Sequence, residues 1–72
     1  MNQQLMKRII KAGGGQSALA RRLNELGDDR ADLGLLSRIH VHQWRRVPAE
    51  RVVHVEQATG ISREEIRPDI FF

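Results

Sequence analysis

Apolar residues in the first third of the chain recur at the spacing of an α-helix. Two adjacent pairs, four residues apart, fall on one helix face: Leu5, Met6, Ile9 and Ile10. Asn2 suits the N-cap of this helix, and the glycines at 13–15 end it. A second run over 16–26 has the same period and stops at Gly27. The pattern therefore predicts two consecutive amphipathic helices.

A third helix is predicted after a polar start. Ser37 suits the N-cap of a helix that runs from Arg38 to about Arg46. Val41 and Trp44 lie three residues apart, so they share a face and should anchor the helix to the core. We expect this helix to bury one face and expose the other.

Proline, glycine and serine delimit the last two helices. Pro48 begins a fourth helix, and Gly60 is its expected C′ residue. Ser62 and Glu65 form a capping box for a fifth helix, which ends before Pro68. The apolar surface of the fourth helix should come from its three valines, Val52, Val53 and Val55.

The segment 27–36 is acidic first and apolar later, and its pattern is too short to predict an element. Its leucines should be covered rather than left in water: Leu33, Leu35 and Leu36. No stretch of the chain alternates between apolar and polar residues as a half-buried strand would. We therefore predict an all-α fold of four or five short helices, in a single domain over 1–72.

Basic residues are concentrated in the first two thirds of the chain. Residues 1–47 carry nine Lys and Arg against four Asp and Glu, a balance of +5, whereas residues 48–72 carry three against five, a balance of −2. A basic region favours a polyanionic partner. The third helix also offers side chains that suit hydrogen bonding to base edges, namely Arg38, His42, Gln43 and Arg46. These features together favour a DNA-binding protein.

Composition argues against several other classes of protein. The chain has no cysteine, so it forms neither a disulfide framework nor a thiolate metal site. His40 and His42 would point roughly 200° apart on a helix, so we expect no metal site. No nucleophile–base–orienter set is visible, so we expect neither catalysis nor a cofactor. No window approaches the roughly 18 apolar residues of a membrane span, which favours the cytoplasm.

The motifs that follow one another along the chain resemble a known family. The run QSALARRL, a polar helix ending in Trp44, and then VPAERV, EQATG and RPDIF are similar to the small Cro-like helix-turn-helix proteins of phages and prophages. Within that group the likeness is to YdaS-type antitoxin or Cro-like regulators, and it covers most of the chain outside 27–36. It implies a lambda-repressor-like helix-turn-helix domain. It also implies a homodimeric, sequence-specific repressor on double-stranded DNA of the cytoplasmic nucleoid.

The resemblance also implies a role for individual residues. Gln16, with Ser17 beside it, looks like the start of the first motif helix, whose N-terminus usually meets a phosphate. Ala20 looks like the small residue where the two motif helices cross. Arg45 and Arg46, at the end of the third helix, are better placed for backbone phosphates than for bases. The residues offered to the major groove are Ser37, Arg38, Ile39, His42 and Gln43.

The chain departs from the family pattern between the two motif helices. Gln16 and Val41 are separated by roughly ten residues more than a tight turn requires. Either a loop bulges from the core and leaves the two helices in their usual relation, or the first motif helix is longer and the second is reoriented. In both cases the acidic residues of this insertion should point away from DNA: Asp28, Asp29 and Asp32.

The C-terminal residues leave two interpretations open. Ile70, Phe71 and Phe72 form an apolar tail, which either covers the small core or contacts a second copy of the chain. A different function would use the same tail together with the acidic segment 28–32. In that case the protein is an antitoxin that binds a toxin protein directly, with or without repression of its own operon.

Overall fold

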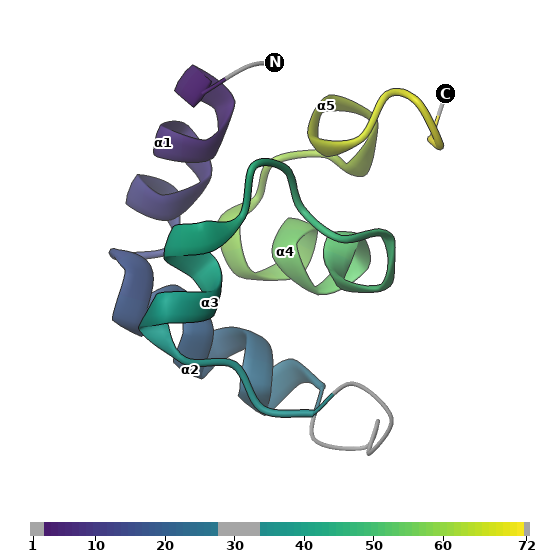
Figure 1. The fold of residues 1–72 in the computed structure, drawn as a ribbon. Coiled ribbons are helices and arrows are strands. Elements are labelled where there is room, and N and C mark those ends of the chain that lie inside the picture. The colour runs from purple at the N-terminus through teal and green to yellow at the C-terminus, as the bar shows by residue number, and fades with distance from the viewer. Residues whose placement is uncertain (1–2, 28–33, 72) are drawn as a thin grey trace.

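The computed structural model describes residues 3–27 and 34–71, which form short helices joined by tight connections (Figure 1). The helices are α1 (Gln3–Ala12), α2 (Gln16–Leu26), α3 (Arg38–Gln43), α4 (Val52–Thr59) and α5 (Arg63–Ile66). A single 3₁₀ turn, η2 (Ala49–Arg51), leads into α4. The described residues contain no strand, which confirms the predicted all-α fold. None of the helices among them has the length and apolar composition needed to cross a membrane.

All five α-helices contribute to one hydrophobic core. Its buried residues are Met6, Ile9, Leu19, Ala20, Leu23, Val41, Val47, Val52, Val55, Ile61 and Ile66. Half-buried residues cover this core, namely Leu5, Ile10, Leu36, Trp44, Ala58 and Phe71. The predicted amphipathic faces of α1 and α2 are therefore confirmed. On α4 the prediction is wrong for Val53, which is exposed, because Val52 and Val55 already share the buried face.

The glycines between α1 and α2 form a tight turn. The backbone N–H groups of Gly13 and Gly15 donate to the carbonyls of Ile9 and Ile10, at 3.0 and 2.8 Å. Gly13 is buried, and a Cβ atom built on it would lie 2.7 Å from Leu19 Cδ1. The turn therefore brings the start of α2 close enough to α1 for the Leu19 side chain to pack against the backbone of Gly13.

Gly60 and Ser62 delimit α4 and α5 as predicted, but α4 begins at Val52 rather than at Pro48, because the residues after Pro48 form the 3₁₀ turn η2. Gly60 adopts a left-handed conformation with φ of 77°, and its N–H donates to Glu56 O at 2.8 Å. The Ser62 side chain accepts a hydrogen bond from the Glu65 backbone N–H at 3.3 Å. The Glu65 carboxylate, predicted to complete the capping box, forms an ion pair with Arg8 instead. This ion pair links α5 to α1.

The third helix is shorter than predicted. It ends at Gln43, and Trp44 has extended backbone angles, with φ of −66° and ψ of 127°. The prediction that the helix reaches Arg46 is therefore wrong. The chain leaves the helix early because Val47 must enter the core, where it is 1% exposed, and because Pro48 disfavours helical geometry in the preceding residue. Val41 is buried and Trp44 is half-buried, as expected of anchors.

The two described leucines of the insertion differ in burial. Leu36 is half-buried against the core, whereas Leu35 is 82% exposed, so the expectation that it would be covered is wrong. The backbone is extended here, and neighbouring side chains in an extended segment point to opposite sides. Further sequence predictions concern Asn2, Leu33 and the three acidic residues of the insertion, and these five residues lie outside the described ones.

The C-terminal tail packs in part against the core. Phe71 is half-buried there, with the Arg63 guanidinium 5.8 Å from its ring centroid, whereas Ile70 is 41% exposed. Phe72 lies outside the described residues. Before the tail, the buried Arg67 donates to Val47 O at 2.8 Å and to both carboxylate oxygens of Asp69 at 2.8 and 2.7 Å. Arg67 thus ties the tail to the segment between α3 and α4.

Candidate nucleic-acid interface

The third helix packs against α2 through one side and presents the other to solvent (Figure 1). Its buried residue is Val41, which is 0% exposed. The side chains of Arg38, Ile39, His42 and Gln43 are exposed. With a rotation of about 100° per residue, Ile39 and Gln43 lie opposite Val41, whereas Arg38 and His42 lie on the flank nearer to α2. The outward surface predicted from the sequence is therefore present in the structure.

The side chains of Gln16 and His42 join the start of α2 to the end of α3. Gln16 Nε2 lies 3.0 Å from His42 Nδ1, within hydrogen-bonding distance. Gln16 is half-buried and His42 is exposed, so the pair lies at the surface. Both residues were predicted to contact DNA, but a contact between them was not predicted. The contact fixes the position of the His42 ring relative to the N-terminus of α2.

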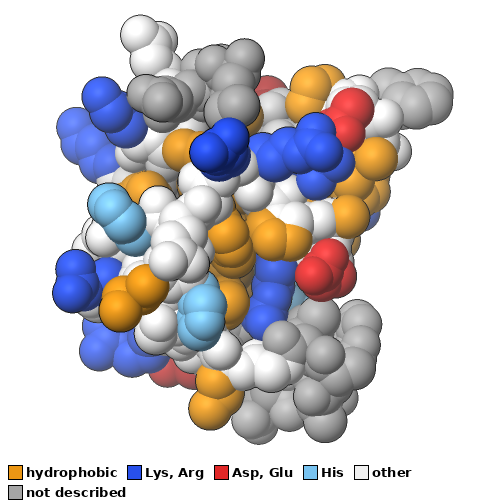
Figure 2. Space-filling view, viewed as in Figure 1, with side chains coloured by type: hydrophobic (Ala, Val, Ile, Leu, Met, Phe, Trp, Pro, Cys, Tyr) orange, Lys and Arg blue, Asp and Glu red, His pale blue; other side chains and the backbone are white. Residues whose placement is uncertain are grey.

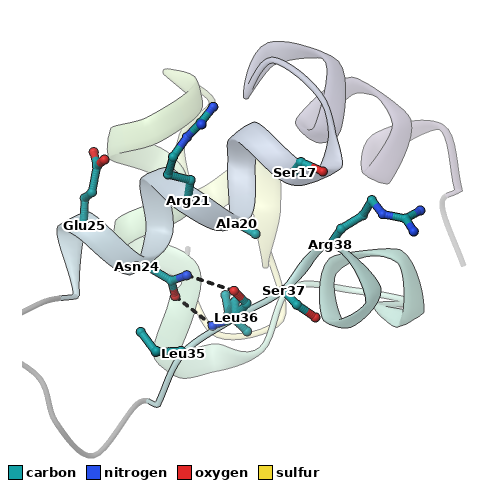
Figure 3. Close-up of a pocket in the computed structure, with 9 residues that line it drawn as sticks. All are labelled: Ser17, Ala20, Arg21, Asn24, Glu25, Leu35, Leu36, Ser37 and Arg38. Atoms are coloured by element: carbon teal, nitrogen blue, oxygen red, sulfur yellow. Dashed lines mark hydrogen bonds between the residues drawn. The ribbon is translucent and has the colours of Figure 1, made fainter.

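The insertion between the two helices is attached to α2 at its C-terminal end. Asn24 Nδ2 donates to Leu36 O, and Leu36 N–H donates to Asn24 Oδ1, both at 2.8 Å (Figure 3). From the other side, the buried Arg51 donates to Gly34 O at 3.1 Å. Because α2 ends at Leu26 as predicted, the alternative with a longer first motif helix is wrong. Residues 34–37 run back along α2, and α3 begins directly after them and packs against α2.

The N-terminus of α3 is capped by His40, a role that the sequence analysis did not predict. Ser37 N–H donates to His40 Nδ1 at 2.9 Å, and the Ser37 hydroxyl lies 3.2 Å from the same nitrogen. His40 sits three residues after the cap, where Glu or Gln is the usual partner. The predicted DNA contact of Ser37 thus involves a hydroxyl that already has a neighbour within the chain.

Two grooves bring most of the predicted site residues together. The first, of about 580 Å³, lies between α2 and the start of α3 and is lined by Ser17, Ser37 and Arg38, among others (Figure 3). Arg21 lines it too, one helical turn after Ser17. Sequence reasoning did not include Arg21 in the site, although its position i+4 to Ser17 was a usable signal.

The second groove, of about 600 Å³, runs between α1 and α3. Gln16, His42, Gln43 and Arg45 line it, so it collects four of the predicted residues from α2, α3 and the segment after α3. Lys7 of α1 lines the same groove. Sequence reasoning did not include Lys7 in the site either, because only the tertiary structure brings α1 beside α3.

Positive charge gathers on the side of the molecule that carries these grooves. Figure 2 shows Lys and Arg side chains over α1, α2 and α3, with histidine side chains among them. Arg45 and Arg46 are exposed in the segment that follows α3. Arg46 Nη1 lies 3.8 Å from Asp69 Oδ2, so this arginine already has a carboxylate neighbour. The guanidinium of Arg46 is therefore partly engaged within the chain.

The structure separates the remaining predicted site residues from the grooves. Ile39 is exposed on the outer face of α3, and Ile70 and Phe71 lie in the C-terminal tail.

The described part of the chain holds no group of three or more His, Asp or Glu side chains that could bind a metal ion. The pKa of Asp69 is lowered to about 2 by its hydrogen bonds from Arg67. Hydrogen bonds from Arg63 likewise lower the pKa of Glu56.

Comparison with known proteins identifies one family. The family model described as bacterial toxin YdaS matches residues 31–72, which are 42 of the 72 residues. The match confirms the YdaS-type resemblance over α3, α4 and α5 and leaves α1 and α2 outside it. No curated protein and no solved structure matches the chain.

Proposed function

The chain belongs to the bacterial toxin YdaS family, and we propose that it acts as a DNA-binding transcriptional repressor. In this proposal the outer face of α3 enters the major groove of double-stranded DNA. The start of α2, with Gln16 and Ser17, meets a backbone phosphate, and Arg45 contacts another. The protein would act in the cytoplasm, on DNA of a phage, a prophage or its own operon.

The contact between Gln16 and His42 carries this proposal. A reading helix needs its polar side chains held in fixed positions before DNA arrives, because ordering them on binding costs free energy. Gln16 holds His42 at 3.0 Å, in the groove that also contains Lys7 and Arg45. The groove thus combines a ring that suits hydrogen bonding to base edges with side chains that suit phosphate, which supports the proposal. The proposal rests on this combination rather than on net charge.

We further propose that the repressor is a homodimer on a pseudopalindromic operator. One helix of six residues offers few base contacts, so a single copy would bind weakly. Two copies related by a twofold axis would read half-sites about one turn of DNA apart. Repression would follow from occupation of promoter DNA, which excludes the polymerase.

Quantitative DNA binding tests the proposal. Duplexes selected from a random pool, together with DNA flanking the gene, are titrated with the protein at several salt concentrations. We expect Arg38→Ala to relax the preference for particular bases. Arg45→Ala or Arg46→Ala should weaken binding to all DNA sequences and reduce the slope of log affinity against log salt concentration by about one. Arg8→Ala is the matched control, because Arg8 pairs with Glu65 between α1 and α5. The absence of salt-dependent binding to any duplex would contradict the proposal.

The family description supports a second candidate function. A protein of a toxin–antitoxin pair would bind a partner protein, and the exposed Ile70 and Leu35 are apolar side chains suited to such a contact. The candidate predicts that capture of a co-transcribed partner survives Arg38→Ala and Gln43→Ala but fails after deletion of residues 70–72. Growth arrest on expression of the chain alone would assign it the role of toxin in that pair.

A further inference from the structure

The outer face of α3 has an apolar side chain near its centre. With a rotation of about 100° per residue, Ile39 and Gln43 lie nearest to the direction opposite the buried Val41, and His42 and Arg38 lie towards one edge of the face. Ile39 is 57% exposed. An apolar group of this size is thus held in water at the position that would approach DNA most closely.

The neighbours of Ile39 define what it would meet in a major groove. Arg38, His42 and Gln43 carry hydrogen-bonding groups, which suit the nitrogen and oxygen atoms of base edges. Ile39 carries none. The apolar group that a normal base pair presents in the major groove is the 5-methyl group of thymine. Contact between the two would remove apolar surface from water on both sides.

We infer that Ile39 determines specificity by contacting the methyl group of a thymine in the bound duplex. The inference rests on the proposed DNA-binding function and adds a base identity to it. The polar side chains beside Ile39 would contact the neighbouring base pairs, so the thymine should lie within the half-site read by α3. Burial of one methyl group corresponds to about a fourfold change in affinity.

Uracil substitution tests the inference without altering the protein. A duplex is first selected from a random pool with the wild-type protein, and each thymine is then replaced singly by uracil, which lacks only the methyl group. Dissociation constants are measured by fluorescence anisotropy for the wild type, Ile39→Val and Ile39→Ala. Thymines in the flanks of the same duplex are the control positions.

The expected result is a loss of about fourfold at one thymine of each half-site with the wild type. Ile39→Ala should bind the uracil and thymine duplexes equally, and Ile39→Val should show a reduced difference. If the wild type binds the selected duplex but tolerates uracil everywhere, the inference is wrong while DNA binding stands. A uracil effect of equal size in Ile39→Ala would also overturn it. If no duplex is selected, the proposed function fails as well.

Discussion

The side-chain amide of Asn24 on α2 forms paired hydrogen bonds with the backbone of Leu36, each 2.8 Å long. The amide thus satisfies one donor and one acceptor of an extended segment, as a neighbouring strand would. Through this pair the end of the long insertion is attached to α2, only two residues before α3 begins. The placement of α3 therefore depends on a side chain in the helix that precedes the insertion.

Replacement of this amide should destabilise the fold. Asn24→Ala leaves a half-buried N–H and carbonyl of Leu36 without their partners, so we expect the free energy of unfolding to fall by about 1–3 kcal/mol. Urea titration followed by circular dichroism measures the change. Glu25→Ala, at the exposed neighbouring position, is the control and should stay within about 0.5 kcal/mol of the wild type. Equal stability of both variants would show that Asn24 does not hold the insertion.

The contact between Gln16 and His42 should appear as coupling in DNA binding. We expect Gln16→Ala and His42→Ala each to weaken binding, and the double variant to lose less than the sum. A coupling free energy of about 0.5–1.5 kcal/mol corresponds to one hydrogen bond. Gln57→Ala, at an exposed position on α4, is the matched control for loss of a glutamine. Strict additivity would mean that the two side chains act separately on DNA.

The ion pair of Asp69 and Arg67 should make stability depend on acidity. Hydrogen bonds from Arg67 lower the pKa of Asp69 from its ordinary 3.8 to about 2. Because the folded value is the lower one, the stabilisation is complete above the ordinary pKa and is lost as the pH falls towards about 2. The variant Asp69→Asn lacks this stabilisation at every pH. The stability difference between the wild type and this variant should therefore shrink as the pH falls over that interval, and a constant difference would contradict the assignment.

The close approach of Gly13 to Leu19 predicts an unusual effect of alanine. At an unconstrained position Gly→Ala usually stabilises by about 0.4–1 kcal/mol, because it restricts the unfolded chain. At Gly13 the added Cβ would lie 2.7 Å from Leu19 Cδ1, and the leucine is fully buried. We expect Gly13→Ala to destabilise by about 1–3 kcal/mol, as overpacking does. Thermal or urea unfolding gives the sign of the change in stability. A stabilised variant would exclude the close contact between residue 13 and Leu19.

Local rules were sufficient to predict most of the secondary structure. The helix over Gln16–Leu26 has the predicted ends, and Gly60 ends α4 as expected, because glycine terminates helices through its own backbone. The buried faces of α1 and α2 followed from their apolar spacing. The exposed face of α3 also followed from the sequence, because Val41 determines which side of this helix is buried.

Tertiary packing decided what these rules could not. The third helix ends at Gln43 because Val47 is needed in the core, and Leu35 is exposed because Asn24 fixes the backbone of Leu36. Lys7, Gln16 and His42 share a groove only because α1, α2 and α3 fold together. The sequence by itself determined the family, most of the helices and the exposed polar residues of α3. Their mutual positions depend on contacts between distant residues, which local patterns do not encode.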